Sequence, residues 1–114
     1  MKKTLIMALT LGLSSAYLQA DCIASGCSDV TVDKLYMTAS GTLYVGTSGD
    51  EKNLNCAGGE GDGGIANVYM SLDKDDAGQN AMYSLLLTAQ TTGKTVKIRI
   101  EEDTDDCRVA YVTQ

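Results

Sequence analysis

Hydrophobic and polar residues alternate along most of the chain from residue 30 onward, a pattern typical of short β-strands with one buried face. The clearest case is the segment 65–72, where Ala66, Val68, Met70 and Leu72 fall on one face. The same pattern predicts five strands, over residues 30–38, 42–47, 65–72, 95–100 and 108–113. We therefore expect a mainly β fold.

The first two predicted strands have the features of a hairpin. Residues 39–42, with the sequence Ala-Ser-Gly-Thr, supply a tight turn between them. Asp33 and Lys34 interrupt the alternation of the first strand, which indicates a bulge or bend. The segment 50–64 contains five glycines and is predicted to be a loop. It is not a phosphate-binding loop, because no Lys followed by Ser or Thr comes after its last glycine.

Between the third and fourth strands the period of the hydrophobic residues changes to that of a helix. A helix over residues 77–91 carries one apolar stripe, made up of Met82, Leu85, Leu86 and Ala89. Asp76 and Gln79 have the spacing of a capping box, and Gly93 stands where a C-terminal cap belongs. Three strands, one helix and two strands is the order of an OB-fold. We expect a small five-stranded OB-fold-like barrel with one α-helix between strands 3 and 4.

The start of the chain has the layout of a secretory signal peptide. A lysine pair is followed by an apolar run over residues 4–13 and by small and polar residues up to Ala20. The run is shorter than the roughly 20 apolar residues that a membrane-spanning helix needs. We expect residues 1–20 to be cleaved and residues 21–114 to form a single domain in the periplasm or outside the cell.

Loss of the leader makes the remaining domain more acidic. The whole chain has a formal charge of −6, and removal of the two leader lysines changes it to −8. An acidic domain is repelled by phosphate backbones and by anionic lipids. We therefore expect neither nucleic acid nor membrane insertion among its interactions.

All four cysteines lie after the predicted leader, where an oxidising compartment favours two disulfides. Three pairings are open, and we favour Cys22–Cys27 with Cys56–Cys107, because the second bond closes a long loop across most of the domain. A zinc site is disfavoured, since the chain has no histidine and no pair of cysteines with two residues between them. We expect no metal and no cofactor.

One segment gives a family resemblance. Residues 82–100, MYSLLLTAQTTGKTVKIRI, resemble the helix-to-strand segment of the subtilase cytotoxin B subunits, where a tyrosine-bearing helix runs into a Thr-Thr-Gly turn and a basic strand. Cys56 and Cys107 flank the segment as the single disulfide of those subunits does. The chain departs from the family in its glycine-rich loop, in the extra cysteines Cys22 and Cys27, and in having neither tryptophan nor phenylalanine.

These B subunits are OB-fold pentamers that bind host glycans and carry an enzymatic A subunit. The resemblance therefore implies a homopentamer, a host glycan as ligand and a secreted A-like chain as partner. The family's sugar-contacting residues near the N-terminus have no counterparts in this chain, so none of them is carried over. The alternative is a free-standing secreted structural or interaction protein without a sugar site.

The residue inventory argues against an enzyme. Without histidine and with its cysteines oxidised, the chain lacks the usual pairs of nucleophile and base. Acids are plentiful in residues 101–106, but five of them in one turn are typical of a solvated tip. The segment 73–78 begins like a calcium-binding loop, yet it lacks the closing glutamate.

Two groups of residues remain as candidates for binding. Tyr36, Tyr44 and Tyr69 lie on predicted strands, and we expect them to bind a glycan, since sugars are commonly held against aromatic faces. Tyr83 and Leu87 lie about 100–140° around the helix from its apolar stripe. We expect both to face outward and to form an oligomer interface.

Overall fold

The structure of the protein is a computed structural model that describes residues 20–56 and 69–114. The predicted signal peptide, apart from its last residue, lies outside the described residues. So do most of the glycine-rich segment and the first half of the strand predicted over 65–72.

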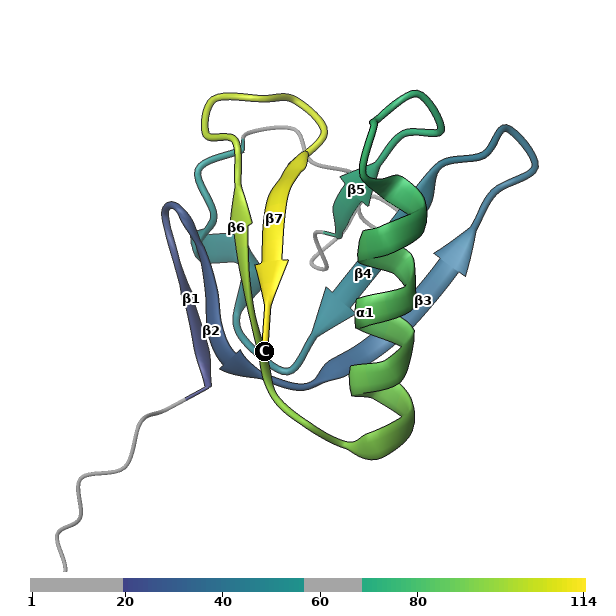
Figure 1. Ribbon diagram of the computed structural model, residues 1–114. Helices are drawn as coiled ribbons and strands as arrows, with labels where there is room; N and C mark the ends of the chain where they lie inside the picture. Colours follow the sequence, from purple (N-terminus) through teal and green to yellow (C-terminus); the bar gives the residue numbers. More distant parts are fainter. Residues whose placement is uncertain (1–19, 57–68) are drawn as a thin grey trace, which may run out of the picture.

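The described residues form seven strands in two antiparallel sheets (Figure 1). The four-stranded sheet has the order β1 (Asp21–Ile23), β2 (Gly26–Val30), β6 (Val96–Ile100) and β7 (Val109–Thr113). The three-stranded sheet has the order β3 (Val32–Met37), β4 (Leu43–Thr47) and β5 (Met70–Leu72). The helix α1 (Gln79–Thr92) contacts β3 and β7, and a short 3₁₀ helix, η1 (Glu51–Asn53), follows β4.

The mainly β class is confirmed, whereas the expected five-stranded OB-fold-like barrel is wrong, because the described residues form seven strands in two sheets. A parallel bridge between Ser71 and Arg108 links β5 to the start of β7, but the two sheets do not close around a common axis. The helix does lie between the third and fourth of the predicted strands in chain order, as expected. The difference comes from an additional hairpin at the start of the domain and from the division of the first predicted strand.

The additional hairpin is formed by β1 and β2. Cys22 and Cys27 lie directly opposite each other in it and are joined by a disulfide. The strand predicted over 30–38 divides at Thr31, so that β2 ends in one sheet and β3 begins in the other. The bulge expected at Asp33 is confirmed, because the register shifts between Val32 and Lys34.

The core lies between the two sheets and under α1. Its apolar side chains come from every strand, and α1 adds Leu86 and Ala89, both fully buried. The second disulfide, Cys56–Cys107, joins the segment after η1 to the residue two before β7. Both predicted pairings are thus present.

The start of the helix differs from the prediction. Helix α1 begins at Gln79, its N-cap residue Gly78 makes no side-chain cap, and the capping box of Asp76 and Gln79 does not form. The side-chain amide of Gln79 instead donates hydrogen bonds through Nε2 to the backbone carbonyls of Gly41 (2.8 Å) and Leu72 (2.9 Å). Gln79 therefore ties the helix to the β3–β4 turn and to the end of β5. The C-terminal cap at Gly93 is as predicted, with a φ of 74°.

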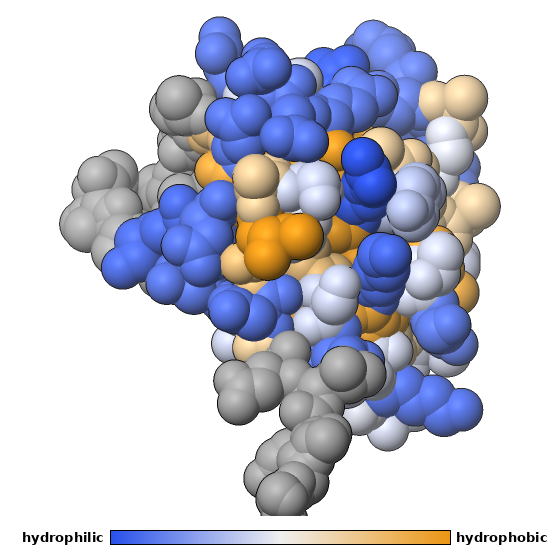
Figure 2. Space-filling model, turned by 90° about the vertical axis from the view of Figure 1, so that its left-hand side faces the viewer, coloured by the Kyte–Doolittle hydropathy of each residue, from blue (hydrophilic) through white to orange (hydrophobic). Residues whose placement is uncertain are grey.

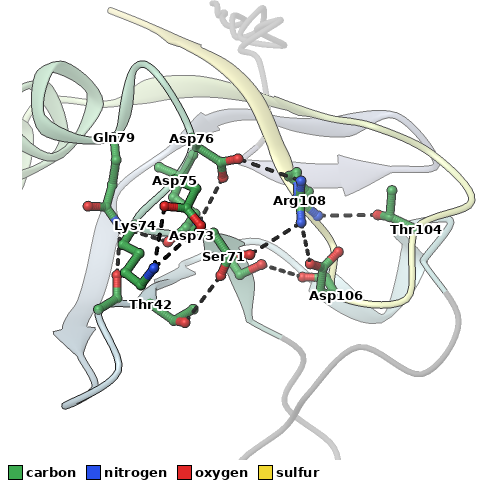
Figure 3. A network of polar contacts seen from close by, with 12 residues as sticks. Thr42, Ser71, Asp73, Lys74, Asp75, Asp76, Gln79, Thr104, Asp106 and Arg108 are labelled. Atoms are coloured by element: carbon green, nitrogen blue, oxygen red, sulfur yellow. Dashed lines mark hydrogen bonds and ion pairs between the residues drawn. The ribbon is translucent and has the colours of Figure 1, made fainter.

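Arg108 links the segment before α1 to the segment before β7 (Figure 3). Its guanidinium lies 3.4 Å from a carboxylate oxygen of Asp73, 3.5 Å from Asp76 and 3.3 Å from Asp106. The hydrogen bond to Asp106 and then the charges of Asp106 and Asp76 raise the pKa of Arg108. Two acids of the segment that resembles a calcium loop, Asp73 and Asp76, are thus paired with Arg108, and the third, Asp75, is paired with Lys74.

Candidate functional site

The three tyrosines that the sequence singled out come together on one face of the three-stranded sheet. Tyr36 of β3 and Tyr44 of β4 are directly opposite each other, with ring centroids 5.1 Å apart and planes inclined by 24°. Tyr69, one residue before β5, meets the Tyr36 ring edge-on at a centroid distance of 5.9 Å. We call Tyr36, Tyr44 and Tyr69 the tyrosine cluster.

Strand alternation places the cluster on the outer face of its sheet. The neighbours Val45 and Met70 are fully buried in the core, so Tyr44 and Tyr69 point the other way. Gly46 makes room for the Tyr69 ring, since a Cβ at position 46 would lie 3.1 Å from that ring. The ammonium of Lys34 lies 5.7 Å from the centre of the same ring, within the range of a cation–π contact.

The members of the cluster differ in exposure. The Tyr36 side chain is 41% exposed, Tyr44 is partly buried and Tyr69 is only 6% exposed. Contacts between offset or edge-to-face aromatic rings are favourable beyond the area that they bury. Tyr36 thus presents an accessible aromatic surface that two less exposed rings hold in place.

A cavity of about 290 Å³ adjoins the cluster. Its lining consists of Asp33, Lys34, Gly46, Thr47, Glu51 and Tyr69. Tyr69 belongs to both the cluster and the cavity, so the aromatic surface and the polar hollow are separated by one ring. Carboxylate, ammonium and hydroxyl groups next to an aromatic face are the combination that fixes a sugar in one orientation.

Glu51 is the residue of this site that sequence reasoning missed. It lies on η1 and is 9% exposed, and its Oε2 accepts hydrogen bonds from the backbone nitrogen and, at 3.0 Å, from the hydroxyl of Thr47. The pKa of Glu51 is raised, chiefly because the carboxyl group is buried. The hydrogen bonds from Thr47 lower this pKa, and the charges of Asp33 and Asp50 raise it. The sequence signal that could have indicated a helical turn here is Asp50, whose side chain caps η1.

The expected pair on the helix does not form. Leu87 is 41% exposed, as predicted, but Tyr83 is partly buried and packs against the core. The expectation that Tyr83 cannot share the core is therefore wrong, since its side chain is partly buried against the core residues. Leu87 is left as the exposed apolar residue of the candidate pair.

The outer face of the four-stranded sheet combines exposed apolar and basic side chains (Figure 2). Ile23 is 65% and Tyr111 42% exposed, and Arg99 lies opposite both Tyr111 and Gly26 in the register. A second cavity, of about 260 Å³, is lined partly by Ile23, Lys97 and Arg99. Figure 2 shows a small hydrophobic patch among hydrophilic side chains on this side.

Neither a membrane span nor a metal centre emerges from the part of the chain that the structure describes. Its helix is not long and apolar enough to cross a bilayer, and none of its His, Cys, Asp and Glu side chains gather in threes around a metal position. The chain matches no protein-family model, no curated protein and no solved structure.

Proposed function

We propose that this protein is an exported, non-catalytic binding protein that holds a glycan on the tyrosine cluster. One observation carries the proposal: three tyrosines from separate segments form a packed cluster whose outermost ring, Tyr36, is exposed beside a polar cavity. Export is supported by the signal-peptide pattern of residues 1–20 and by the two disulfides.

The physical basis is the fit between a sugar and this surface. A pyranose ring presents C–H groups on its faces and hydroxyl groups around its rim. The C–H face packs on the Tyr36 ring, and the rim hydroxyls bond to the side chains of the cavity. Because the cluster is already packed, little side-chain entropy is lost when the sugar binds.

The absence of catalysis is part of the proposal. The chain has no histidine, and all four cysteines are in disulfides. Among the described residues, Asp33 and Glu51 are the two carboxylates that line the cavity, but Glu51 is held by Thr47 through two hydrogen bonds. We therefore assign the carboxylates to binding rather than to proton transfer.

The resemblance to toxin B subunits extends the proposal to self-association and to a secreted A-like chain. Leu87, exposed on α1, is the residue on which a helix-mediated contact between copies would depend. The partly buried Tyr83 contributes less than the sequence suggested.

Replacing Tyr36 by alanine is expected to weaken glycan binding at least tenfold, which corresponds to about 1.4 kcal/mol. The reason is that the variant removes the exposed ring on which the sugar rests. Binding is measured first on a glycan array with the purified mature protein, and then by titration of the best glycan against the variant.

Tyr111→Ala is the matched control, because Tyr111 is 42% exposed but lies on the other sheet. It should bind the glycan like the unchanged protein. A protein that binds no glycan on the array would contradict the proposed function, as would equal losses in the two variants.

The second candidate is a free-standing interaction protein, and the outer face of the four-stranded sheet favours it. Ile23 and Tyr111 are exposed there together with Lys97 and Arg99, and aromatic residues and arginine are enriched in protein interfaces. If the protein binds no glycan on the array, this second candidate is the better supported function.

A further inference from the structure

We infer that the cavity beside Tyr69 selects neutral, hydroxyl-bearing sugars over acidic ones, with Glu51 as the principal acceptor of a sugar hydroxyl. This inference rests on the proposed function, because it assigns the ligand class of the same site. It goes further because it names Glu51 as the group that discriminates between classes of sugar. Glu51 lies on η1 and not in the tyrosine cluster.

Glu51 carries an unused acceptor. Both hydrogen bonds from Thr47 end on Oε2, whereas Oε1 receives no hydrogen bond from any residue that the structure describes. A buried acceptor without a donor is costly, so such an oxygen normally meets water or a ligand. Because Glu51 lines the cavity, a ligand there that brings a hydroxyl donor satisfies this oxygen.

The other groups of the cavity also favour a donor. Asp33 supplies a second carboxylate, and its Oδ1 already accepts a hydrogen bond from the Thr31 hydroxyl at 2.8 Å. Among the described residues, Lys34 is the single cation that lines the cavity, and it lies over the Tyr69 ring. Two carboxylates against one ammonium make this described lining rich in acceptors and negative in sum.

This balance of charges discriminates between sugars. Hydroxyl groups donate to the carboxylates and accept from Lys34, so a pair of neighbouring hydroxyls fits both kinds of partner. A sugar carboxylate or sulfate would instead meet two groups of its own sign, and around the buried Glu51 carboxylate the repulsion is screened less than in water. We therefore expect acidic sugars to be rejected.

The size of the cavity suits one sugar unit. Its volume of about 290 Å³ is just below the roughly 300–1,000 Å³ of sites for drug-sized ligands. Tyr69 forms one wall of the cavity and touches Tyr36 edge-on. A single saccharide residue can therefore contact the aromatic surface and reach the acceptors of the cavity.

The test compares three hexoses with their uronic acids. Glucose, galactose and mannose, and then glucuronate, galacturonate and mannuronate, are titrated against the mature protein at millimolar concentrations by NMR. At least one neutral hexose should bind, and its uronic acid should bind at least tenfold more weakly. A uronic acid that binds as well as its hexose, or better, would overturn the inference.

The substitution Glu51→Gln tests the acceptor itself. Glutamine has the same shape and keeps a carbonyl oxygen for Thr47, but it puts an amide donor where Oε1 was an acceptor. We expect at least a tenfold loss of affinity for the hexose that binds best. Glu101→Gln is the matched control, since Glu101 is exposed on the acidic turn, and it should leave the affinity unchanged.

Asp33→Asn is a second variant at an exposed position, useful if Glu51→Gln does not fold, and it should weaken hexose binding by several-fold. If Tyr36→Ala weakens binding while Glu51→Gln and Asp33→Asn do not, the proposed function stands and the selection by Glu51 is refuted. If none of the six sugars binds and the array is also empty, both the function and the inference fall.

Discussion

Replacing Cys56 and Cys107 together by alanine is expected to lower the free energy of unfolding by about 4 kcal/mol. The bond joins residues 51 positions apart, and without it the unfolded chain regains the entropy of that long loop. Such a loss is a large share of the total stability of a domain this small, so much of the population should be unfolded at 37 °C. Urea denaturation of the purified variant, followed by circular dichroism, measures the loss.

The disulfide Cys22–Cys27 provides the comparison. It closes a loop with a sequence separation of 5, and its removal should cost only about 2 kcal/mol by the same relation. Equal losses in the two double variants would show that loop entropy does not govern the stability of this protein.

Leu86→Ala should destabilise the protein by about 2–5 kcal/mol, because the side chain is fully buried and its truncation leaves a cavity beneath α1. Its chain neighbour Leu87 is 41% exposed, and Leu87→Ala should change the stability of the monomeric protein by no more than about 0.5 kcal/mol. The two variants remove the same atoms from adjacent positions of one helix, so only burial differs.

Thermal and urea unfolding of both variants give the two values. If Leu87→Ala is as destabilising as Leu86→Ala, then Leu87 is buried in solution. A loss in Leu87→Ala that shrinks on dilution would identify the burying surface as a second copy of the chain, since association stabilises the unchanged protein less at lower protomer concentration.

Sequence reasoning was most reliable where strands alternate strictly. The strands β4, β6 and β7 lie within the predicted ranges. One face of each is buried in the core, so hydrophobic residues recur at every second position of the sequence. The strands β1 and β2 were missed for the opposite reason. Their residues include Ser28 and Asp29, with Asp29 at a φ of 53°, and their pairing interrupts the period of two.

Two details of α1 were decided by tertiary contacts. Gln79 had the right spacing for a capping box, but its amide found partners on Gly41 and Leu72 of the neighbouring segments. Tyr83 stands off the apolar stripe by helical angle, yet its long side chain packs against the core. Helical periodicity gives the direction of a Cα–Cβ bond and not the reach of a large ring.

The candidate site was predictable in part. Alternation placed Tyr44 and Tyr69 on the polar face of their strands, and the pairing of β4 with β3 and β5 then brought the three tyrosines together. Glu51 was hidden in a segment that reads as a glycine-rich loop. Its burial depends on the 3₁₀ turn and on Thr47, which no periodic pattern reports.

The central claim is that glycans bind at the tyrosine cluster, and NMR of the mature protein with ¹³C-labelled tyrosine rings tests it most directly. Each ring gives its own signals, and the neutral hexose that binds best is added in steps. We expect the signals of Tyr36, and to a smaller extent those of Tyr44 and Tyr69, to shift with saturation while those of Tyr111 stay in place. Shifts confined to Tyr111, or no shift in any ring, would contradict the account.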